Sequence, residues 1–239
     1  MADHSAPPTE PGAAPVEEHP AIPAATVVLV RDGADGLETL MLRRNTKLAF
    51  AGGRWVWPGG RVDPDDYPPD APDDVLAAAR RAAVREAAEE SGLAIDEHQL
   101  VWFSHWTPPE VSPKRFATWF FAAPAPEGTV TIDGGEIHDH VWIAPAEAMR
   151  RRNALEIELL PPTWITLEYL ARYDDTETAL AGLGAEGPEY FATRIAFVGP
   201  DVVALYHGDA GYDDGDPDRP GRRHRLWMGA DGWRYERTP

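Results

Sequence analysis

The sequence predicts an α+β protein, and three observations lead to that class. Runs of β-branched residues separated by turn signals read as strands, as in the pair Thr26–Asp32 and Leu37–Arg44. A single long alanine-rich stretch at Val75–Ser91 reads as a helix. The last third of the chain returns to short hydrophobic runs with glycine-containing turns. Strands on both sides of one central helix favour an α+β fold or an α/β/α sandwich with a β-rich C-terminal extension.

The chain begins with a segment that does not read as part of the fold. Residues 1–25 contain six prolines and seven alanines but no lysine or arginine. This composition predicts a flexible acidic tail. The first hairpin then follows, with its turn at Gly33–Gly36, and the stretch Ala49–Asp74 is rich in Gly, Pro and Asp, which predicts mostly loop.

The helix at Val75–Ser91 carries signals at both ends. Pro72 and Asp73 lie near its start, and Gly92 follows directly after its last residue. Acidic side chains satisfy the free N–H groups of a first turn, and glycine adopts the left-handed conformation that ends many helices. These signals fix the helix more firmly than any other element.

The remaining elements are shorter. Strands are predicted at Leu100–Trp106, Ala117–Ala123, Thr129–Ile132 and Asp139–Ala144, and helices near Pro145–Arg151 and Trp164–Tyr173. Two hairpins are predicted at 190–208 and 223–236, separated by the polar loop Asp209–Arg223. We therefore expect a main domain over residues 26–175 and a C-terminal β-hairpin extension over 176–239, packed on the same domain.

Composition limits the classes of partner. The 239 residues include 40 acidic and 22 basic side chains, for a net charge of −18. This balance argues against a nucleic-acid polymer or an anionic membrane surface as partner. The chain has no cysteine, so disulfides and thiolate ligands are excluded. With neither a long apolar run nor a signal-peptide pattern, the sequence predicts a soluble, cytoplasmic protein.

One stretch of the helix carries chemistry. Glu86, Glu89 and Glu90 share one helix face, where like charges repel one another. A solvated charged surface is one explanation. A bound cation is the other, because Mg2+ prefers carboxylate oxygens and often bridges to substrate phosphates. Arg85 beside them is suited to orient neighbouring carboxylates through bidentate hydrogen bonds.

These residues belong to a longer motif. The segment from Gly60 to Leu93 resembles the Nudix box, G-x5-E-x7-R-E-U-x-E-E-x-G-U, in which U is a bulky aliphatic residue. Gly60 matches the first glycine, and the stretch Arg85–Leu93 matches the R-E, E-E and G-U positions, with Ala87 in place of the bulky residue. The resemblance implies a Nudix-type α/β/α sandwich with a mixed sheet.

The match has two departures. Asp66 stands where the family has glutamate, and 18 residues rather than seven separate it from Arg85, an insertion of 11. An interrupted box of this kind resembles the acyl-coenzyme A diphosphatase branch. Gly53 and the following Trp-Pro-Gly-Gly are similar to a coenzyme A pattern, although Ala49 replaces its arginine.

The resemblance also implies roles for individual residues. Glu86, Glu89 and Glu90 would ligate Mg2+ or Mn2+. Glu86, Arg85 and Glu136 are the candidate catalytic residues, Glu136 as the acid outside the box that completes the metal site or acts as base. The candidate substrate-binding residues are Gly59, Gly60, Arg43, Arg44, Lys114 and Arg115.

The function implied by the resemblance is Mg2+-dependent hydrolysis of a nucleoside diphosphate linked to another moiety. Coenzyme A or acyl-coenzyme A leads as substrate. Two alternatives stay open: a pyrophosphatase for ADP-ribose, NADH or another dinucleotide, and a Nudix-fold module that binds a nucleotide without cleaving it. The sequence leaves the oligomeric state open, with a homodimer as one possibility.

Overall fold

The structure is a computed structural model that describes residues 21–47, 51–110, 112 and 115–238. The predicted tail at 1–20 lies outside these described residues. The end of that predicted tail is wrong, because residues 22–25 form the beginning of the first strand. Their backbone pairs with two other strands, and this pairing overrides the tail-like composition.

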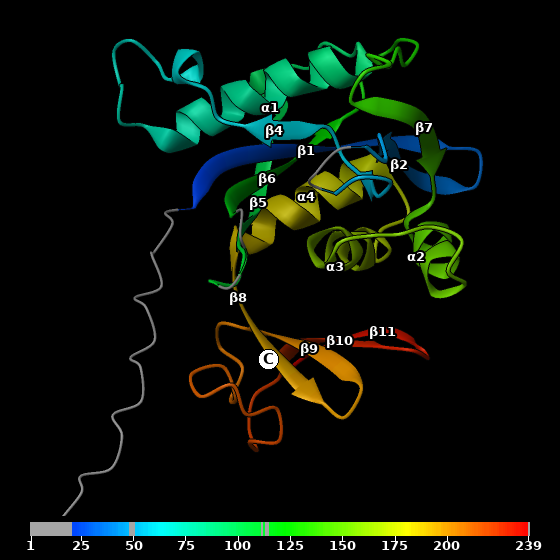
Figure 1. The fold of residues 1–239 in the computed structure, drawn as a ribbon. Helices are drawn as coiled ribbons and strands as arrows, with labels where there is room; N and C mark the ends of the chain where they lie inside the picture. Colours follow the sequence, from blue (N-terminus) through cyan, green and yellow to red (C-terminus); the bar gives the residue numbers. More distant parts are fainter. Residues whose placement is uncertain (1–20, 48–50, 111, 113–114, 239) are drawn as a thin grey trace, which may run out of the picture.

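The described residues form one sheet of eleven strands with helices on its faces (Figure 1). The main path of the sheet runs β11-β10-β9-β8-β5-β6-β1-β2-β3, with β4 paired to β1 and β7 to β2. The strands are β1 (Ile22–Gly33), β2 (Gly36–Arg44), β3 (Trp55–Val56), β4 (Gly59–Arg61), β5 (Val101–Thr107), β6 (Phe116–Pro124), β7 (Ile137–Ile143), β8 (Glu189–Val198), β9 (Asp201–Tyr206), β10 (His224–Gly229) and β11 (Gly232–Arg237). The helices are α1 (Val75–Ser91), α2 (Pro145–Asn153), α3 (Pro161–Leu170) and α4 (Thr176–Glu186), with short 3-10 turns at Pro64–Asp66 and Glu97–Gln99.

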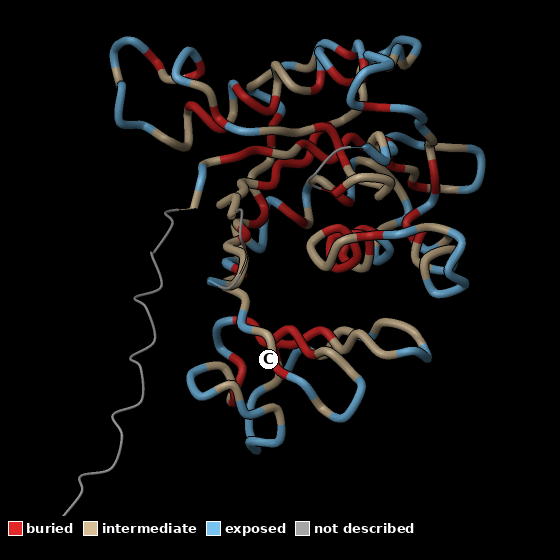
Figure 2. The backbone as a smooth tube through the Cα atoms, in the orientation of Figure 1, coloured by how far each residue is buried: buried red, intermediate tan, exposed pale blue. Residues whose placement is uncertain are grey.

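Strand β1 explains why the sheet is covered on both faces. Val27 and Leu29 belong to the core cluster beneath α1, whereas Val28 and Val30 belong to the cluster that includes α3 and α4. Successive side chains of a strand point to opposite faces, so a run of apolar residues requires two covering layers. The predicted α/β/α sandwich with a mixed sheet is confirmed; Figure 1 shows α1 on one side and α3 and α4 on the other, and Figure 2 shows the buried core between them.

Helix α1 has the predicted bounds and ends at the predicted Gly92, while its N-cap is Asp74, one residue after the predicted Asp73. The carboxylate of Asp74 accepts a hydrogen bond from the backbone N–H of Ala77, and Gly92 ends the helix with φ at 71°. The face toward the sheet consists of alanines, including Ala79 and Ala83 with no exposed surface. Because alanine is small, the helix backbone lies close to the sheet and its longer acidic side chains project past the edge of the contact.

The stretch Ala49–Asp74 is predicted to be mostly loop, and its described residues are mostly loop. They also contain the short strands β3 and β4 and a 3-10 turn. Gly59 and Gly60 pair with β1 opposite Thr26 and Ala25, since glycine allows this close approach. The predicted strand Thr129–Ile132 is absent from the described structure: its N–H at Thr131 instead donates to the carbonyl of Ser91 at the end of α1. The apolar side chains of this segment, Val130 and Ile132, pack against the core beneath α1, which explains the strand-like pattern.

Helix α4 is an element that the sequence analysis missed. It lies within the segment assigned to the β-hairpin extension and packs against β5, β6 and β1. Asp175 caps it by accepting from the N–H of Thr178, at 2.8 Å. Its glycines and threonines weaken the helical signal in the sequence, so packing rather than propensity stabilises this helix.

The two predicted C-terminal hairpins form the strands β8 to β11. Strand β8 runs parallel to β5, which joins these strands to the main sheet. Two aromatic pairs, Trp164 with Trp233 and Tyr169 with Tyr235, connect α3 to β11. Helix α3 is therefore in contact with both the main sandwich and the C-terminal strands. Among the described residues, no helix is long and apolar enough to cross a membrane.

Candidate active site

A cavity of about 1020 Å³ opens beside the C-terminal half of α1. Its other walls include strands β1, β4, β6, β8 and β9, the residues after β5, and the start of α3. One wall is polar and carries the glutamates of α1, and other walls carry apolar residues such as Trp106 and Ile195. The cavity therefore combines a charged region with an apolar region.

Glu90 is the most deeply buried of the helix glutamates, with 5% of its surface exposed. Its carboxylate accepts a hydrogen bond from the N–H of Gly59 at 2.9 Å and lies 3.8 Å from the guanidinium of Arg44. Burial, which disfavours the charged form, raises the pKa of Glu90 to about 8 despite these partners. A cation bound at this carboxylate would offset the cost of its charge.

Glu86 lies against the backbone of β4. A Cβ added at Gly60 would be 2.2 Å from Oε1 of Glu86, so only glycine leaves room for this carboxylate. Oε1 accepts a hydrogen bond from Arg85 at 2.8 Å. Burial raises the pKa of Glu86, while Arg85 acts in the opposite direction.

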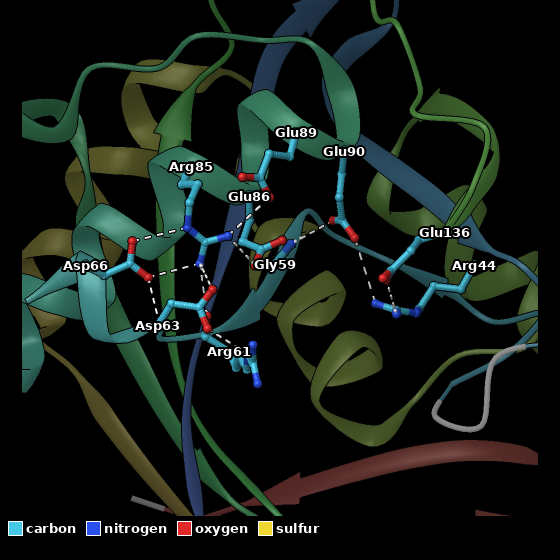
Figure 3. Close-up of polar contacts among 10 residues, drawn as sticks. All are labelled: Arg44, Gly59, Arg61, Asp63, Asp66, Arg85, Glu86, Glu89, Glu90 and Glu136. Carbon is cyan, nitrogen blue, oxygen red and sulfur yellow. Dashed lines mark hydrogen bonds and ion pairs between the residues drawn. The ribbon is translucent and has the colours of Figure 1, made fainter.

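Arg85 connects the two parts of the box (Figure 3). Its Nε and Nη2 donate to the two oxygens of Asp66 at 3.2 and 3.0 Å, and Nη1 donates to Glu86 and to Glu89 at 2.8 and 3.2 Å. Nη2 also donates to the carbonyl of Arg61. The hydrogen bond with Asp66 is the largest of the effects that raise the pKa of Arg85. Its planar, five-donor group is well suited to hold several carboxylates in fixed orientations.

Glu136 reaches the same site from the segment before β7. Its carboxylate, 58% exposed, accepts a hydrogen bond from Arg44 at 2.8 Å. Arg44 thereby lies between Glu136 and Glu90, as Figure 3 shows. The carboxylate of Asp133 accepts from the N–H groups of Glu136 and Ile137 and fixes the turn that presents Glu136.

The structure brings most of the predicted site residues together and leaves some outside. The predicted site residues that line the cavity are Arg44, Gly59, Gly60, Arg85, Glu86, Glu89, Glu90 and Glu136. Among the described residues, Arg43 is exposed and does not line the cavity, since strand alternation turns it away from Arg44. Arg115 also lies outside the lining, with its Nη2 donating to the carbonyl of Pro108. Lys114 lies outside the described residues.

Three charged residues among the described cavity lining were missed. Arg61 and Asp63, joined by an ion pair of 2.7 Å, lie directly after the glycines of β4. Asp133 lies in the turn before Glu136. Arg61 and Asp63 fall within the recognised box, so their position was a usable signal, whereas only the folded chain brings Asp133 to the site.

The donor chemistry of the cavity fits a divalent metal ion. Of the described residues that line it, six carry carboxylates and three carry guanidinium groups. This excess of negative charge would repel an anionic substrate unless cations neutralise it. Within the described residues, no group of three acidic or histidine side chains is already arranged to hold a metal ion, because Arg85 and Arg44 engage these carboxylates. The hard oxygen donors are nevertheless of the type that Mg2+ prefers.

Fold and site together define a class: an acidic site with oxygen donors that fit a divalent metal ion, on an α/β/α sandwich. The model of the NUDIX domain family matches residues 21–162. The chain belongs to the Nudix family. Its site is that of a pyrophosphohydrolase, which acts on a phosphorus-containing acid anhydride. Enzymes of this family generally use divalent metals such as Mg2+.

The chain is also similar to several solved structures. A Nudix hydrolase from Alicyclobacillus acidocaldarius is 25% identical, with a TM-score of 0.62 over 68% of this chain and 96% of that chain. The Nudix domain of Shewanella oneidensis NrtR, solved with ADP-ribose, is 16% identical, with a TM-score of 0.49 over 67% of this chain and 92% of that chain. An Ap4A hydrolase from C. elegans is 23% identical, with a TM-score of 0.41 over 62% of this chain and 96% of that chain. No curated protein matches the chain.

Proposed function

We propose that this Nudix protein is a Mg2+-dependent hydrolase that cleaves the diphosphate bond of a nucleoside diphosphate derivative, with coenzyme A or acyl-coenzyme A as the leading substrate. The observation that carries the proposal is the convergence of Glu86, Glu89, Glu90 and Glu136 on one cavity. Their combined charge suits a diphosphate only in the presence of divalent cations.

The metal-binding residues in this proposal are Glu86, Glu89 and Glu90. Glu89 is 59% exposed and can reorient toward an ion, while Glu90 is held by Gly59. When bound, Mg2+ or Mn2+ supplies Lewis acidity and neutralises the diphosphate. Arg85 keeps Glu86 and Glu89 at the cavity wall, and this positioning limits the reorganisation needed on binding.

The proton acceptor in this proposal is Glu86 or Glu136. Burial raises the pKa of Glu86, which makes its carboxylate a better base than an exposed one. Glu136 is more exposed and shares Arg44 with Glu90. The base would take a proton from the water that attacks phosphorus, with the diphosphate held in line for the displacement.

The substrate assignment is supported by the presence of both a polar side and apolar walls in the cavity. Arg44 and Arg61, which pair with Glu136 and Asp63, are cations on the polar side whose remaining donors suit phosphate oxygens. Trp106, Phe120 and Ile195 give the other walls an apolar surface that suits an acyl or other apolar group. A volume of about 1020 Å³ leaves room for a substrate much larger than a diphosphate.

The test is a comparison of substrates at fixed salt and Mg2+. Acyl-coenzyme A, coenzyme A, 3'-dephospho-coenzyme A, ADP-ribose and NADH are supplied in parallel, and the products are separated. The proposal expects the highest kcat/KM for coenzyme A or its acyl form, with 3',5'-ADP as one product. Equal kcat/KM for the 3'-dephospho form, or preference for ADP-ribose or NADH, would replace coenzyme A with a dinucleotide-type substrate. Absence of hydrolysis of every compound would favour a binding module.

A further inference from the structure

A second cavity, here named the C-terminal pocket, lies at one end of strands β8 to β11. Because neighbouring strands are antiparallel, the start of β8, the end of β9, the start of β10 and the end of β11 meet there. Its volume is about 320 Å³, large enough for a small ligand. It lies beyond residue 162, where the match to the family ends. Its polar lining includes Glu189, His207, Arg222, Arg223, His224 and Arg237.

The C-terminal pocket is cationic in a chain whose net charge is −18. The guanidinium of Arg222 forms no hydrogen bond or ion pair with the described residues, and Arg223 donates to the carbonyl of Arg219 at 2.7 Å. Glu189 is the one carboxylate among the described lining residues. One of its oxygens already accepts from Arg237 at 2.8 Å and from the hydroxyl of Tyr169 at 2.6 Å. The remaining positive charge favours an anionic ligand.

His224 adds a more specific requirement. Only 7% of its surface is exposed, and its Nδ1 lies 2.8 Å from the carbonyl oxygen of His207. Since a carbonyl can only accept, Nδ1 carries the hydrogen of this bond. Burial, the main influence, lowers the pKa of His224, so the ring is neutral near pH 7 and its Nε2 is an acceptor.

This Nε2 is buried and has no hydrogen-bond partner among the described residues. The nearest carboxylate oxygen, on Glu189 at 3.6 Å, is itself an acceptor and cannot satisfy it. A buried polar atom without a partner costs free energy, and natural sites rarely leave one unpaired. The pocket therefore offers arginine donors for an anion and one buried acceptor for a hydrogen on that same anion.

We propose that the C-terminal pocket binds a phosphate group that carries a proton, either as inorganic phosphate or as the monoanion of a phosphomonoester. The unprotonated oxygens accept from Arg222, Arg223 and Arg237, and the P–O–H donates to Nε2 of His224. Sulfate has similar size and charge but no proton to donate at neutral pH. The site is separate from the catalytic cavity, so it does not depend on the proposed substrate.

The experiment is isothermal titration of the full chain with inorganic phosphate, glycerol phosphate and sulfate. It is carried out at constant ionic strength, at pH 7, where the His224 ring is neutral, and with chelator, so that metal-dependent binding in the catalytic cavity is removed. We expect saturable phosphate binding that exceeds sulfate binding at least tenfold. Binding of glycerol phosphate as well identifies an ester as ligand, and binding of inorganic phosphate alone identifies the free ion.

Two variants and a control make the test specific. Arg222→Gln removes an unpaired cation and is expected to weaken phosphate binding about tenfold, as loss of one charged hydrogen bond does. His224→Asn keeps a donor toward His207 but lacks Nε2, so phosphate should bind no better than sulfate. Arg81→Gln, an exposed arginine of α1, changes the charge equally and should leave binding unchanged.

The nitrogen spectrum of the histidine rings gives a second readout. The NMR resonance of Nε2 of His224 should shift on addition of phosphate and not on addition of sulfate. A histidine with only a structural role would show no such difference. The proposal is overturned by absence of saturable binding below ~10 mM phosphate, by equal affinity for sulfate, or by full binding in both pocket variants. If His224→Asn fails to fold, the double variant Arg222→Gln with Arg223→Gln takes its place. Hydrolysis should be unchanged in the variants, which separates this proposal from the catalytic one.

Discussion

The guanidinium of Arg85 holds the carboxylate of Asp66 through two hydrogen bonds, of 3.2 and 3.0 Å, across the 18 residues that separate them in the sequence. Asp66 is 6% exposed and also accepts from the N–H of Asp63 at 2.8 Å. The shorter aspartate thus reaches the arginine because the 3-10 turn at Pro64–Asp66 brings its backbone toward α1. The contact therefore joins the 3-10 turn to α1 despite the long segment between them.

This pair should be energetically coupled. We expect a double-mutant cycle with Arg85→Lys and Asp66→Asn to give a coupling free energy of about 1.5–3 kcal/mol in urea unfolding, since both partners are substantially buried. Lysine keeps the charge but cannot form the bidentate pair of hydrogen bonds. Arg81→Lys, on the exposed face of the same helix, is the matched control and should show no coupling to Asp66. Additive losses for Arg85 and Asp66 would contradict the structural role.

The helix glutamates should be required for activity and not for folding. Glu90→Gln keeps an acceptor for the N–H of Gly59 and removes a carboxylate whose burial opposes its charge. We therefore expect an unchanged or slightly higher melting temperature. Turnover should fall on the order of 10²-fold or more when the metal-binding oxygen is lost. Glu89→Gln should behave alike, and Glu127→Gln, an exposed loop acid, is the control. Full turnover by either site variant, or by the unchanged protein in excess chelator, would contradict the metal assignment.

Alanine substitutions at the two adjacent glycines of β4 should affect stability and activity differently. An added Cβ at Gly59 would lie 2.4 Å from the carbonyl oxygen of Ala25, a backbone atom that cannot move aside. At Gly60 the close atoms belong to the carboxylate of Glu86, which can rotate away. Gly59→Ala should therefore lower the melting temperature clearly, whereas Gly60→Ala should fold and lose activity through displacement of Glu86. Thermal unfolding and kcat/KM of both variants check this, and the reverse pattern would refute it.

The segment between Asp66 and α1 should tolerate shortening only where it does not include the helix start. Deleting Tyr67–Ala77 would restore the family spacing, but it removes the cap Asp74, the first helical residues of α1 and the partly buried Leu76. We expect this deletion to destabilise the fold, since the cap alone contributes about 1 kcal/mol. Deleting Pro69–Asp73, in which every residue except the half-buried Ala71 is exposed, should retain folding and chelator-sensitive hydrolysis. Melting temperatures of the two deletions test the distinction, and equal stability would show that the first turn of α1 is dispensable.

The C-terminal strands should be sensitive to acid through one buried ion pair. The two oxygens of Asp209 accept from Arg225 at 2.7 and 2.6 Å, and Arg225 is 1% exposed. Burial acts to raise the pKa of Asp209, but these bonds dominate and hold it below the ordinary value of 3.8. A lowered pKa in the folded state contributes stability above that ordinary value, and this contribution is lost as the pH falls through the folded pKa.

Asp209→Asn removes this titration and leaves Arg225 buried without its counter-charge. We expect a loss of about 3–5 kcal/mol at neutral pH, and a smaller difference from the unchanged protein below about pH 4. Urea unfolding across this pH range measures both effects. A difference that is independent of pH would mean that Asp209 is not ionised in the fold.

The sequence by itself determined the features that depend on local spacing. The bounds of α1, its end at Gly92, and the common face of Glu86, Glu89 and Glu90 all follow from side chains a few residues apart. The first hairpin and the C-terminal hairpins follow from alternation and turn residues in the same way. The family was accessible for the same reason, because most of its box is contained in one helix.

Tertiary structure decided the features that depend on distant segments. The pattern at Thr129–Ile132 is strand-like, yet these residues pack beneath α1. Helix α4 has a weak local signal and forms because the sheet offers it an apolar surface. Glu136 meets Arg44 and Glu90 only when β7 lies beside β2, and the burial that shifts the pKa of Glu90 is a property of the whole fold. Spacing fixes which side chains share a face, whereas packing fixes which faces meet and how far water is excluded from them.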